Sequence, residues 1–92
     1  MLAQNFPNPF NSSTVIMFSI PEAFSGGPVN LAIFDVQGRL VKRLLHTQMP
    51  GGKYATRWDG TDASGAVAAS GVYFYHLVVG NQRSIGKMSF VK

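Results

Sequence analysis

The sequence of 92 residues contains no cysteine and no long apolar run. The absence of cysteine excludes a disulfide scaffold and a thiolate metal site, and it leaves the cellular compartment open. A membrane-spanning helix needs roughly 18 apolar residues in succession, and no stretch approaches that length, so no membrane insertion is expected. The N-terminus also lacks the charged and then apolar pattern of a signal peptide, so a secreted parent protein is expected to carry its export signal elsewhere.

Charged residues are scarce as well, at 13% of the chain, which is about half the usual share. Eight basic residues against four acidic ones give a net charge of +4, which raises the question of a nucleic-acid or anionic partner. The cations are scattered, however, and the one dense group consists of Arg39, Lys42 and Arg43. This trio is interpreted as a solvated strand end, and no nucleic-acid partner is expected.

What the chain does contain is a series of short β-branched and aromatic runs, separated by clusters of Gly, Pro, Asn and Asp. Helical periodicity is nearly absent. The predicted strands cover residues 14–20, 29–36, 40–46, 53–58, 71–79 and 83–91, with a short further piece at 66–68. This pattern, in a chain long enough for one core, predicts a single all-β domain: a small antiparallel immunoglobulin-like β-sandwich of about seven strands.

Alternation within these strands predicts which side chains face the core. Most aromatic residues fall on the buried phase, and Trp58 is expected to be buried with them. Phe34 and Phe74 fall on the opposite phase, although packing between the sheets remains the favoured interpretation for aromatic residues here. The strand at 40–46 leaves two inward pairs open, because Leu40 with Leu44 and Val41 with Leu45 both fit.

The groups required by common catalytic mechanisms are missing or far apart in the sequence. Acyl transfer needs a nucleophile, a base and an orienting group, yet neither His46 nor His76 has an acid or a serine within a few residues. Glycoside hydrolysis needs two carboxylates across a cleft, and three of the four acids lie beside turn glycines. No phosphate-binding loop is present. The chain is therefore predicted not to be an enzyme, with no catalytic residue, cofactor or small-molecule substrate.

The segment 59–65 is the one candidate for a metal site. Asp59 and Asp62 lie close together in a loop, where carboxylate and carbonyl oxygens are the ligands that calcium takes. Two carboxylates are few for an ion that takes six to eight oxygens, and their spacing differs from the EF-hand pattern. Turns stabilised by the Asp side chains are the preferred interpretation, and no metal is expected.

An unusual segment near the N-terminus, Asn5-Phe6-Pro7-Asn8-Pro9-Phe10-Asn11, carries a family resemblance. Its closely spaced Pro7 and Pro9 predict an extended arm over residues 1–13 that leads into a body over residues 14–92. The segment resembles the opening motif of type A sorting domains of the type IX secretion system, in which Tyr is more usual at the position of Phe6.

Further segments resemble the same family in the same order along the chain. The segment 33–39 resembles its apolar-aromatic-Asp-x-x-Gly-Arg hairpin through Asp35, Gly38 and Arg39, with Phe34 in place of the more usual Tyr. The segments 71–77 and 87–92 resemble its Gly-x-Tyr strand and its closing strand, which begins with Lys. Trp58-Asp59-Gly60 also resembles the immunoglobulin-like domain of flagellar hook-capping proteins, a related family.

The resemblance implies a non-catalytic sorting module. A parent protein, continuous with this domain, would pass through the periplasm and across the outer membrane of a Gram-negative bacterium to the cell surface. The partners implied are the outer-membrane translocon, which would recognise the domain, and a sortase, which would remove it. Recognition is expected at Gly71, Tyr73, Lys87 and Lys92. The alternative is a structural, assembly or carbohydrate-binding module of a secreted or hook-capping protein.

Overall fold

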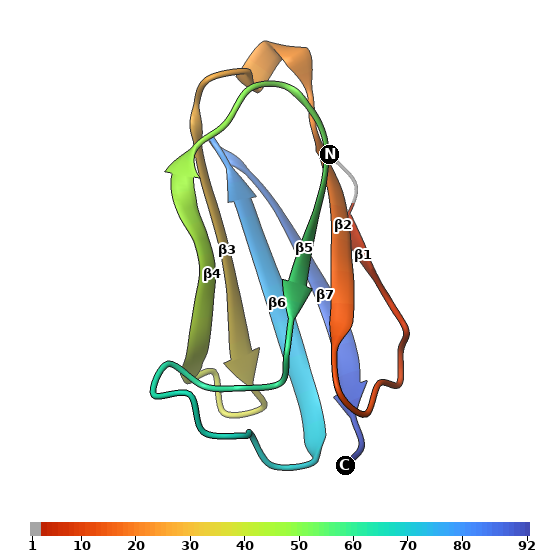
Figure 1. The fold of residues 1–92 in the computed structure, drawn as a ribbon. Helices are drawn as coiled ribbons and strands as arrows, with labels where there is room; N and C mark the ends of the chain where they lie inside the picture. Colours follow the sequence, from red (N-terminus) through yellow and green to blue (C-terminus); the bar gives the residue numbers. More distant parts are fainter. Residues whose placement is uncertain (1–2) are drawn as a thin grey trace.

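The structure, a computed structural model, describes residues 3–92 and consists of two antiparallel sheets packed face to face (Figure 1). One sheet has the order β1-β2-β5, with β1 (Ala3–Phe6), β2 (Thr14–Ile20) and β5 (Gly52–Trp58). The other has the order β4-β3-β6-β7, with β3 (Pro28–Asp35), β4 (Leu40–Gln48), β6 (Gly71–Val79) and β7 (Gln82–Phe90). The predicted immunoglobulin-like sandwich is confirmed. Within the described residues no helix is long and apolar enough to cross a membrane.

Alternation explains why the strands form where they do. In β2 and β6 every second side chain is buried between the sheets, and the intervening ones face outward. The predicted strand at 14–20 is reproduced without change, and Pro21, which has no N–H to donate to a ladder, follows its end. β3, β5 and β7 differ from prediction only at their terminal residues.

The ambiguity of β4 has a structural cause. Its pairing with β3 shifts register twice, between Leu31 and Ala32 and again between Ile33 and Phe34. Each shift places an extra residue in β4, and the extra residue of such a bulge turns toward the same side as its neighbour. Val41, Leu44 and Leu45 therefore all pack against the core, whereas Leu40 is exposed. Neither predicted pair describes the strand completely.

The core is centred on Trp58, which is completely buried, as the sequence predicts. Its ring forms T-shaped contacts with the rings of Phe10 and Tyr73, at centroid distances of 5.5 Å and 5.3 Å. Phe10 in turn stacks on Phe90 at 4.8 Å. Phe34 and Phe74 lie on the outward phase of the four-stranded sheet and are half-buried. The aromatic cluster thus joins residues from the start, the middle and the end of the chain.

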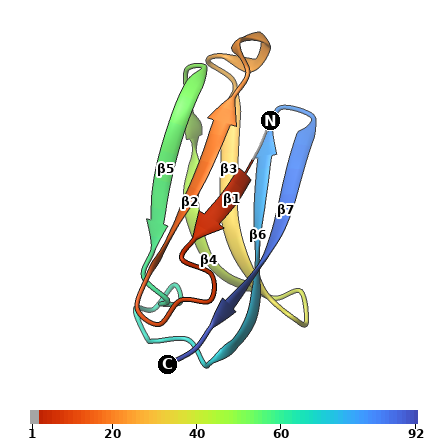
Figure 2. The same ribbon diagram turned by 90° about the vertical axis from the view of Figure 1, so that its right-hand side faces the viewer.

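The N-terminal arm contributes to both layers. Residues 3–6 form β1 and pair with 15–18 of β2, and Phe10 enters the core with 3% of its surface exposed. The peptide bonds Phe6–Pro7 and Asn8–Pro9 are cis. Figure 2 shows the arm crossing from β1 to the lower part of β7. The predicted arm thus adds a strand and one core side chain to the sandwich, whereas residues 6–9 between them are exposed.

Candidate recognition surface on the closing strand

The opening motif and the closing strand, which lie near opposite ends of the sequence, are in direct contact. The side-chain amide of Asn8 donates from Nδ2 to the carbonyl oxygen of Lys87 at 3.1 Å, and its Oδ1 accepts from the N–H of Ser89 at 3.0 Å. One side chain thus offers β7 a donor and an acceptor, as the main chain of a neighbouring strand does. We call Asn8 and Phe10, with the β7 residues that they touch, Lys87, Ser89 and Phe90, the closing-strand contact.

Phe10 extends this contact with its main chain. Its N–H donates to the carbonyl of Ser89 at 3.0 Å, and its carbonyl accepts from the N–H of Val91 at 2.9 Å. Its ring lies on Phe90, which also lies close to Gly60. Gly60 has a φ of 77°, and a Cβ there would lie 2.9 Å from the Phe90 ring, so both conformation and space require glycine.

The four residues predicted for translocon recognition are placed very differently. Lys87 and Lys92 are exposed, and the Lys92 N–H donates to the hydroxyl of Ser70 at 3.0 Å. Gly71 is exposed at the start of β6. Tyr73 is buried against Trp58 and donates its hydroxyl to the Ala69 carbonyl at 2.6 Å. Burial, and to a smaller extent the Asp35 carboxylate, raises the pKa of Tyr73, so this side chain remains a neutral donor in the core.

The predicted hairpin turn after β3 is held by Asp35. Its Oδ1 accepts from the N–H groups of Gln37 at 2.9 Å and Arg39 at 3.0 Å, and its Oδ2 accepts from Arg39 Nε at 3.0 Å. These bonds, chiefly the one from the Arg39 N–H, lower the pKa of Asp35. Gly38 has a φ of 81°, which the turn requires. The roles of Asp35, Gly38 and Arg39 are therefore explained by the turn that they form.

The loop after β5 is organised by the two aspartates considered for calcium. Asp59 Oδ1 accepts from the N–H and hydroxyl of Thr61, and Asp62 Oδ1 accepts from the N–H and hydroxyl of Ser64 and the N–H of Ala66. These bonds lower the pKa of both carboxyls. The indole of Trp58 donates to the Thr61 carbonyl at 2.9 Å. Among the described residues, no group of three acid, His or Cys side chains is arranged to hold a metal.

The predicted short piece at 66–68 forms an isolated bridge between Thr61 and Val67 and does not lengthen into a strand. Lys42 supports the same loop from β4, because its Nζ donates to the Thr61 hydroxyl at 2.8 Å and lies 3.7 Å from Asp59 Oδ1. The loop therefore contacts both sheets, and its polar groups stabilise the conformation of the loop itself.

One structural requirement of β7, a glycine at position 86, was not predicted from the sequence. Gly86 pairs with Tyr75 of β6, and the Tyr75 ring passes over it so that its hydroxyl donates to the Ala3 carbonyl at 2.7 Å. A Cβ at position 86 would lie 2.0 Å from Tyr75 Cζ, which is far closer than van der Waals contact allows. A glycine in the interior of a predicted strand was the available signal, since it indicates close approach of another group.

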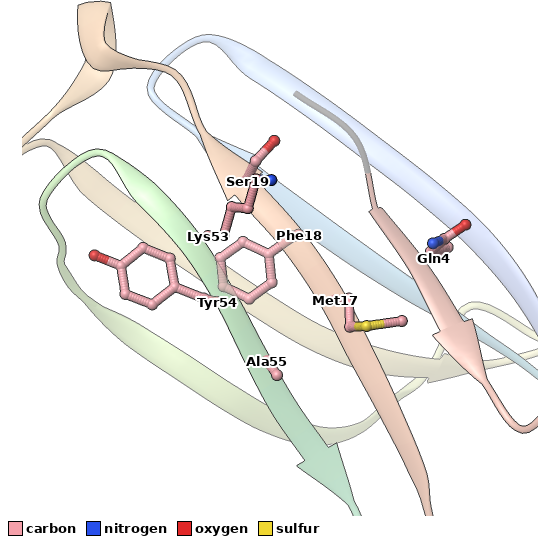
Figure 3. A pocket seen from close by; sticks show the side chains of 7 residues that line it. All are labelled: Gln4, Met17, Phe18, Ser19, Lys53, Tyr54 and Ala55. Carbon is pink, nitrogen blue, oxygen red and sulfur yellow. The ribbon is translucent and has the colours of Figure 1, made fainter.

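The outer surface of the three-stranded sheet has a shallow hollow of about 500 Å³ over β2 and β5 (Figure 3). Its lining is formed by Gln4, Met17, Phe18, Ser19, Lys53, Tyr54 and Ala55. The Tyr54 hydroxyl is already used, donating to the Pro50 carbonyl at 2.7 Å. With one cation and no acid, these residues provide no pair for acid–base chemistry.

Comparison with known protein families identifies the domain. Residues 12–83 match the FlgD Ig-like domain. The chain belongs to this family. The resemblance inferred from Trp58-Asp59-Gly60 is thereby confirmed. No match was found among curated proteins.

Two solved structures extend the likeness beyond the matched residues. Dimeric latent PorU from Porphyromonas gingivalis is 30% identical with a TM-score of 0.76, and the similarity covers 97% of this chain and 9% of that chain. PorZ from the same organism, an essential surface component of its type-IX secretion system, is 20% identical with a TM-score of 0.64. The similarity to PorZ covers 98% of this chain and 11% of that chain, and it shows the fold. This FlgD Ig-like domain thus corresponds to a small part of each.

The two kinds of match differ at the closing-strand contact. The family match stops before most of β7 and begins after Asn8 and Phe10. The likeness to PorU covers 97% of the chain, so it extends past both ends of the family match. The closing-strand contact therefore lies outside the part of the chain that the family model matches.

Proposed function

We propose that this FlgD Ig-like domain is a non-catalytic sorting module that directs a parent protein through the type IX secretion system to the cell surface. In this proposal the parent reaches the periplasm, the outer-membrane translocon recognises the folded domain, and a sortase then removes it. The chemistry belongs to the sortase, and the domain supplies a recognition surface.

The observation that carries the proposal is the extent of the likeness to PorU. It covers 97% of the chain and so extends past both ends of the family match, toward the opening motif and the closing strand that mark the resemblance to sorting domains. These two segments meet on β7 through Asn8. Their contact holds the main chain of Lys87 while its side chain stays exposed, which is the arrangement that a partner needs in order to read it.

The surface for recognition is centred on Lys87 and Lys92. Both side chains are exposed on or just after β7, and neither forms an ion pair with another described residue. Gly71 pairs with Phe90 at the same end of the sheet. Tyr73 acts from the interior, where its hydroxyl fixes the Ala69 carbonyl just before β6. Its contribution is to the shape of this end of the domain.

The test is export of a reporter fused to this domain in a bacterium that has the type IX system. The intact fusion should reach the surface, and the Lys87→Ala and Lys92→Ala double variant should remain in the periplasm. Because both residues are exposed, their replacement should change the free energy of unfolding by less than about 0.5 kcal/mol each. Removal of residues 86–92 should also block export, although this deletion removes core residues.

Two matched variants separate recognition from folding. Lys53→Ala and Arg57→Ala remove two exposed cations from β5, and this pair should leave export unchanged. Phe90→Ala, which should cost about 3–5 kcal/mol, shows what instability alone does to the reporter. Surface delivery of the Lys87 and Lys92 variant at the level of the intact fusion would remove these residues from recognition.

The alternative function is assembly or structural support, which the match to the FlgD Ig-like domain favours. It predicts that an intact fusion never reaches the surface of a bacterium with the secretion system. Retention of the folded, intact fusion in the periplasm would therefore replace the sorting proposal with the assembly one.

A further inference from the structure

We propose that the exposed edge of β7 at residues 83–87 binds an extended acidic peptide, which adds to the sheet as a further strand. The expected peptide alternates as acidic, any, apolar, any, acidic. This inference does not rest on the sorting function, because a strand-binding edge serves an export receptor and an assembly partner equally.

The main chain of β7 provides the template. Ser89 turns its N–H and carbonyl away from β6, toward Asn8 and Phe10, and Lys87 turns its carbonyl the same way. Main-chain groups alternate along a strand, and the pairing of β7 with β6 runs without a register shift. Arg83 and Ile85 therefore also turn their N–H and carbonyl groups to the outer edge.

The hydrogen bonds of the arm cover only the lower half of this edge. Its contacts reach Lys87, Ser89 and Val91, whereas no residue of the described chain pairs with the outward main-chain groups of Arg83 or Ile85. Figure 2 shows the upper part of β7 at the margin of the sheet, beside β6. A row of unpaired main-chain groups of this kind accepts an added strand.

The side chains along the edge indicate what the added strand carries. Arg83, Ile85 and Lys87 all point outward from the sandwich, and Ile85 is 61% exposed. Side chains directly opposite one another on paired strands lie on the same face, about 5 Å apart. An acid opposite each cation and an apolar residue opposite Ile85 are therefore the complementary choice.

No acid within the described chain satisfies these cations. Asp35, Asp59 and Asp62 lie in their own turns, and the two ion pairs of the structure use Arg39 and Lys42. Arg83 and Lys87 are free to pair with a partner. Their charge selects an acidic peptide over a basic one.

Two of the other edges, β4 and β5, fit such a peptide less well. β4 is interrupted by two register shifts, and its Val41 carbonyl accepts from the N–H of Ala63 in the loop after β5. β5 places Lys53 and Arg57 on either side of Ala55, so it has similar charges without an exposed large apolar side chain. That similarity makes β5 the appropriate control.

The experiment is a titration of the folded domain with a fluorescent peptide, Thr-Glu-Thr-Val-Thr-Glu-Thr, followed by anisotropy. The peptide reads the same in both directions, so the test assumes no strand direction. Binding should protect the Arg83 and Ile85 amides from hydrogen exchange, since both are unpaired in the free domain. The double variant Arg83→Glu/Lys87→Glu should weaken binding roughly tenfold and prefer a peptide with Lys in place of Glu.

Matched controls decide between strand addition and simple charge attraction. Lys53→Glu/Arg57→Glu alters the net charge by the same amount and should leave the affinity within about twofold. A peptide N-methylated at every residue from its first to its second glutamate should not bind, because none of these residues can donate to the edge. Equal weakening by the β5 and β7 variants, equal binding of the methylated peptide, or no binding at about 1 mM would each overturn the proposal. None of these results depends on the export reporter.

Discussion

Replacement of Gly86 by alanine should destabilise the domain strongly, although this residue lies on an edge strand and is not fully buried. A Cβ at this position would occupy the space of the Tyr75 ring. That ring is only 4% exposed, and its hydroxyl is fixed by the bond of 2.7 Å to the Ala3 carbonyl. The ring has no room to move without giving up this bond.

The size of the effect follows from two limits. Overpacking with local adjustment costs about 1–3 kcal/mol, and complete loss of a buried aromatic contact costs about 3–5 kcal/mol. Loss of the hydrogen bond from the Tyr75 hydroxyl adds about 1 kcal/mol to the cost of overpacking. We therefore expect Gly86→Ala to lower the free energy of unfolding by about 2–4 kcal/mol.

Urea unfolding followed by the fluorescence of Trp58, the single tryptophan, measures this change. Ser84→Ala, on the same strand and face, should change stability by less than about 0.5 kcal/mol and serves as the control. In a Tyr75→Leu background the penalty of Gly86→Ala should fall by at least about 1 kcal/mol, because the obstructing ring is gone. If Gly86→Ala is as mild as Ser84→Ala, or its cost is the same in both backgrounds, the proposed overlap with the Tyr75 ring is wrong.

Further measurements test other parts of the structure. Asn8→Ala removes both side-chain bonds to β7 and should cost about 1–2 kcal/mol in urea unfolding; an unchanged midpoint would contradict the role given to this contact. Trp58→Ala should cost about 3–5 kcal/mol, and a loss below about 1 kcal/mol would contradict its burial. The carboxyls of Asp35, Asp59 and Asp62 have pKa values lowered below 3.8, so their stabilisation is present above that pH and is lost as the pH falls through the folded values. The urea midpoint should therefore decrease as the pH falls from about 4 to about 2, and a rise would reverse the sign assigned to these groups. Millimolar calcium should leave the melting temperature unchanged, and a rise abolished by Asp62→Ala would show that this loop binds the ion.

The strands of the body were predictable because they depend on a local rule. Burial of one sheet face imposes a period of two, and that period is visible in β2 and β6 without knowledge of their neighbours. β1 was not predicted as a strand, because Ala3–Phe6 has four residues, no β-branched side chain and only half-buried inward positions. Its pairing depends on β2 and on the Tyr75 hydroxyl, neither of which is near in sequence.

The closing-strand contact was beyond local reasoning for a related cause. Asn8 lies 79 and 81 residues from its partners, and both partners are main-chain groups, which every residue type possesses. Nothing in the sequence around Lys87 or Ser89 marks them as partners of an amide. The resemblance to a family drew on both segments, and only the fold showed that they touch.

This contact also explains why the family alone does not determine the role. The matched residues 12–83 contain β2 to β6, whose alternation is required by any sandwich of this kind, whatever it binds. In β7, alternate residues meet the requirements of folding and of binding, because Phe90 and Met88 fill the core while Lys87 and Ile85 face outward. Under the sorting proposal, a variant of the inward set should change stability and export together, and a variant of the outward set should change recognition alone. Comparison of Lys87→Ala with Phe90→Ala therefore tests the function on a strand where the fold has already separated the two effects.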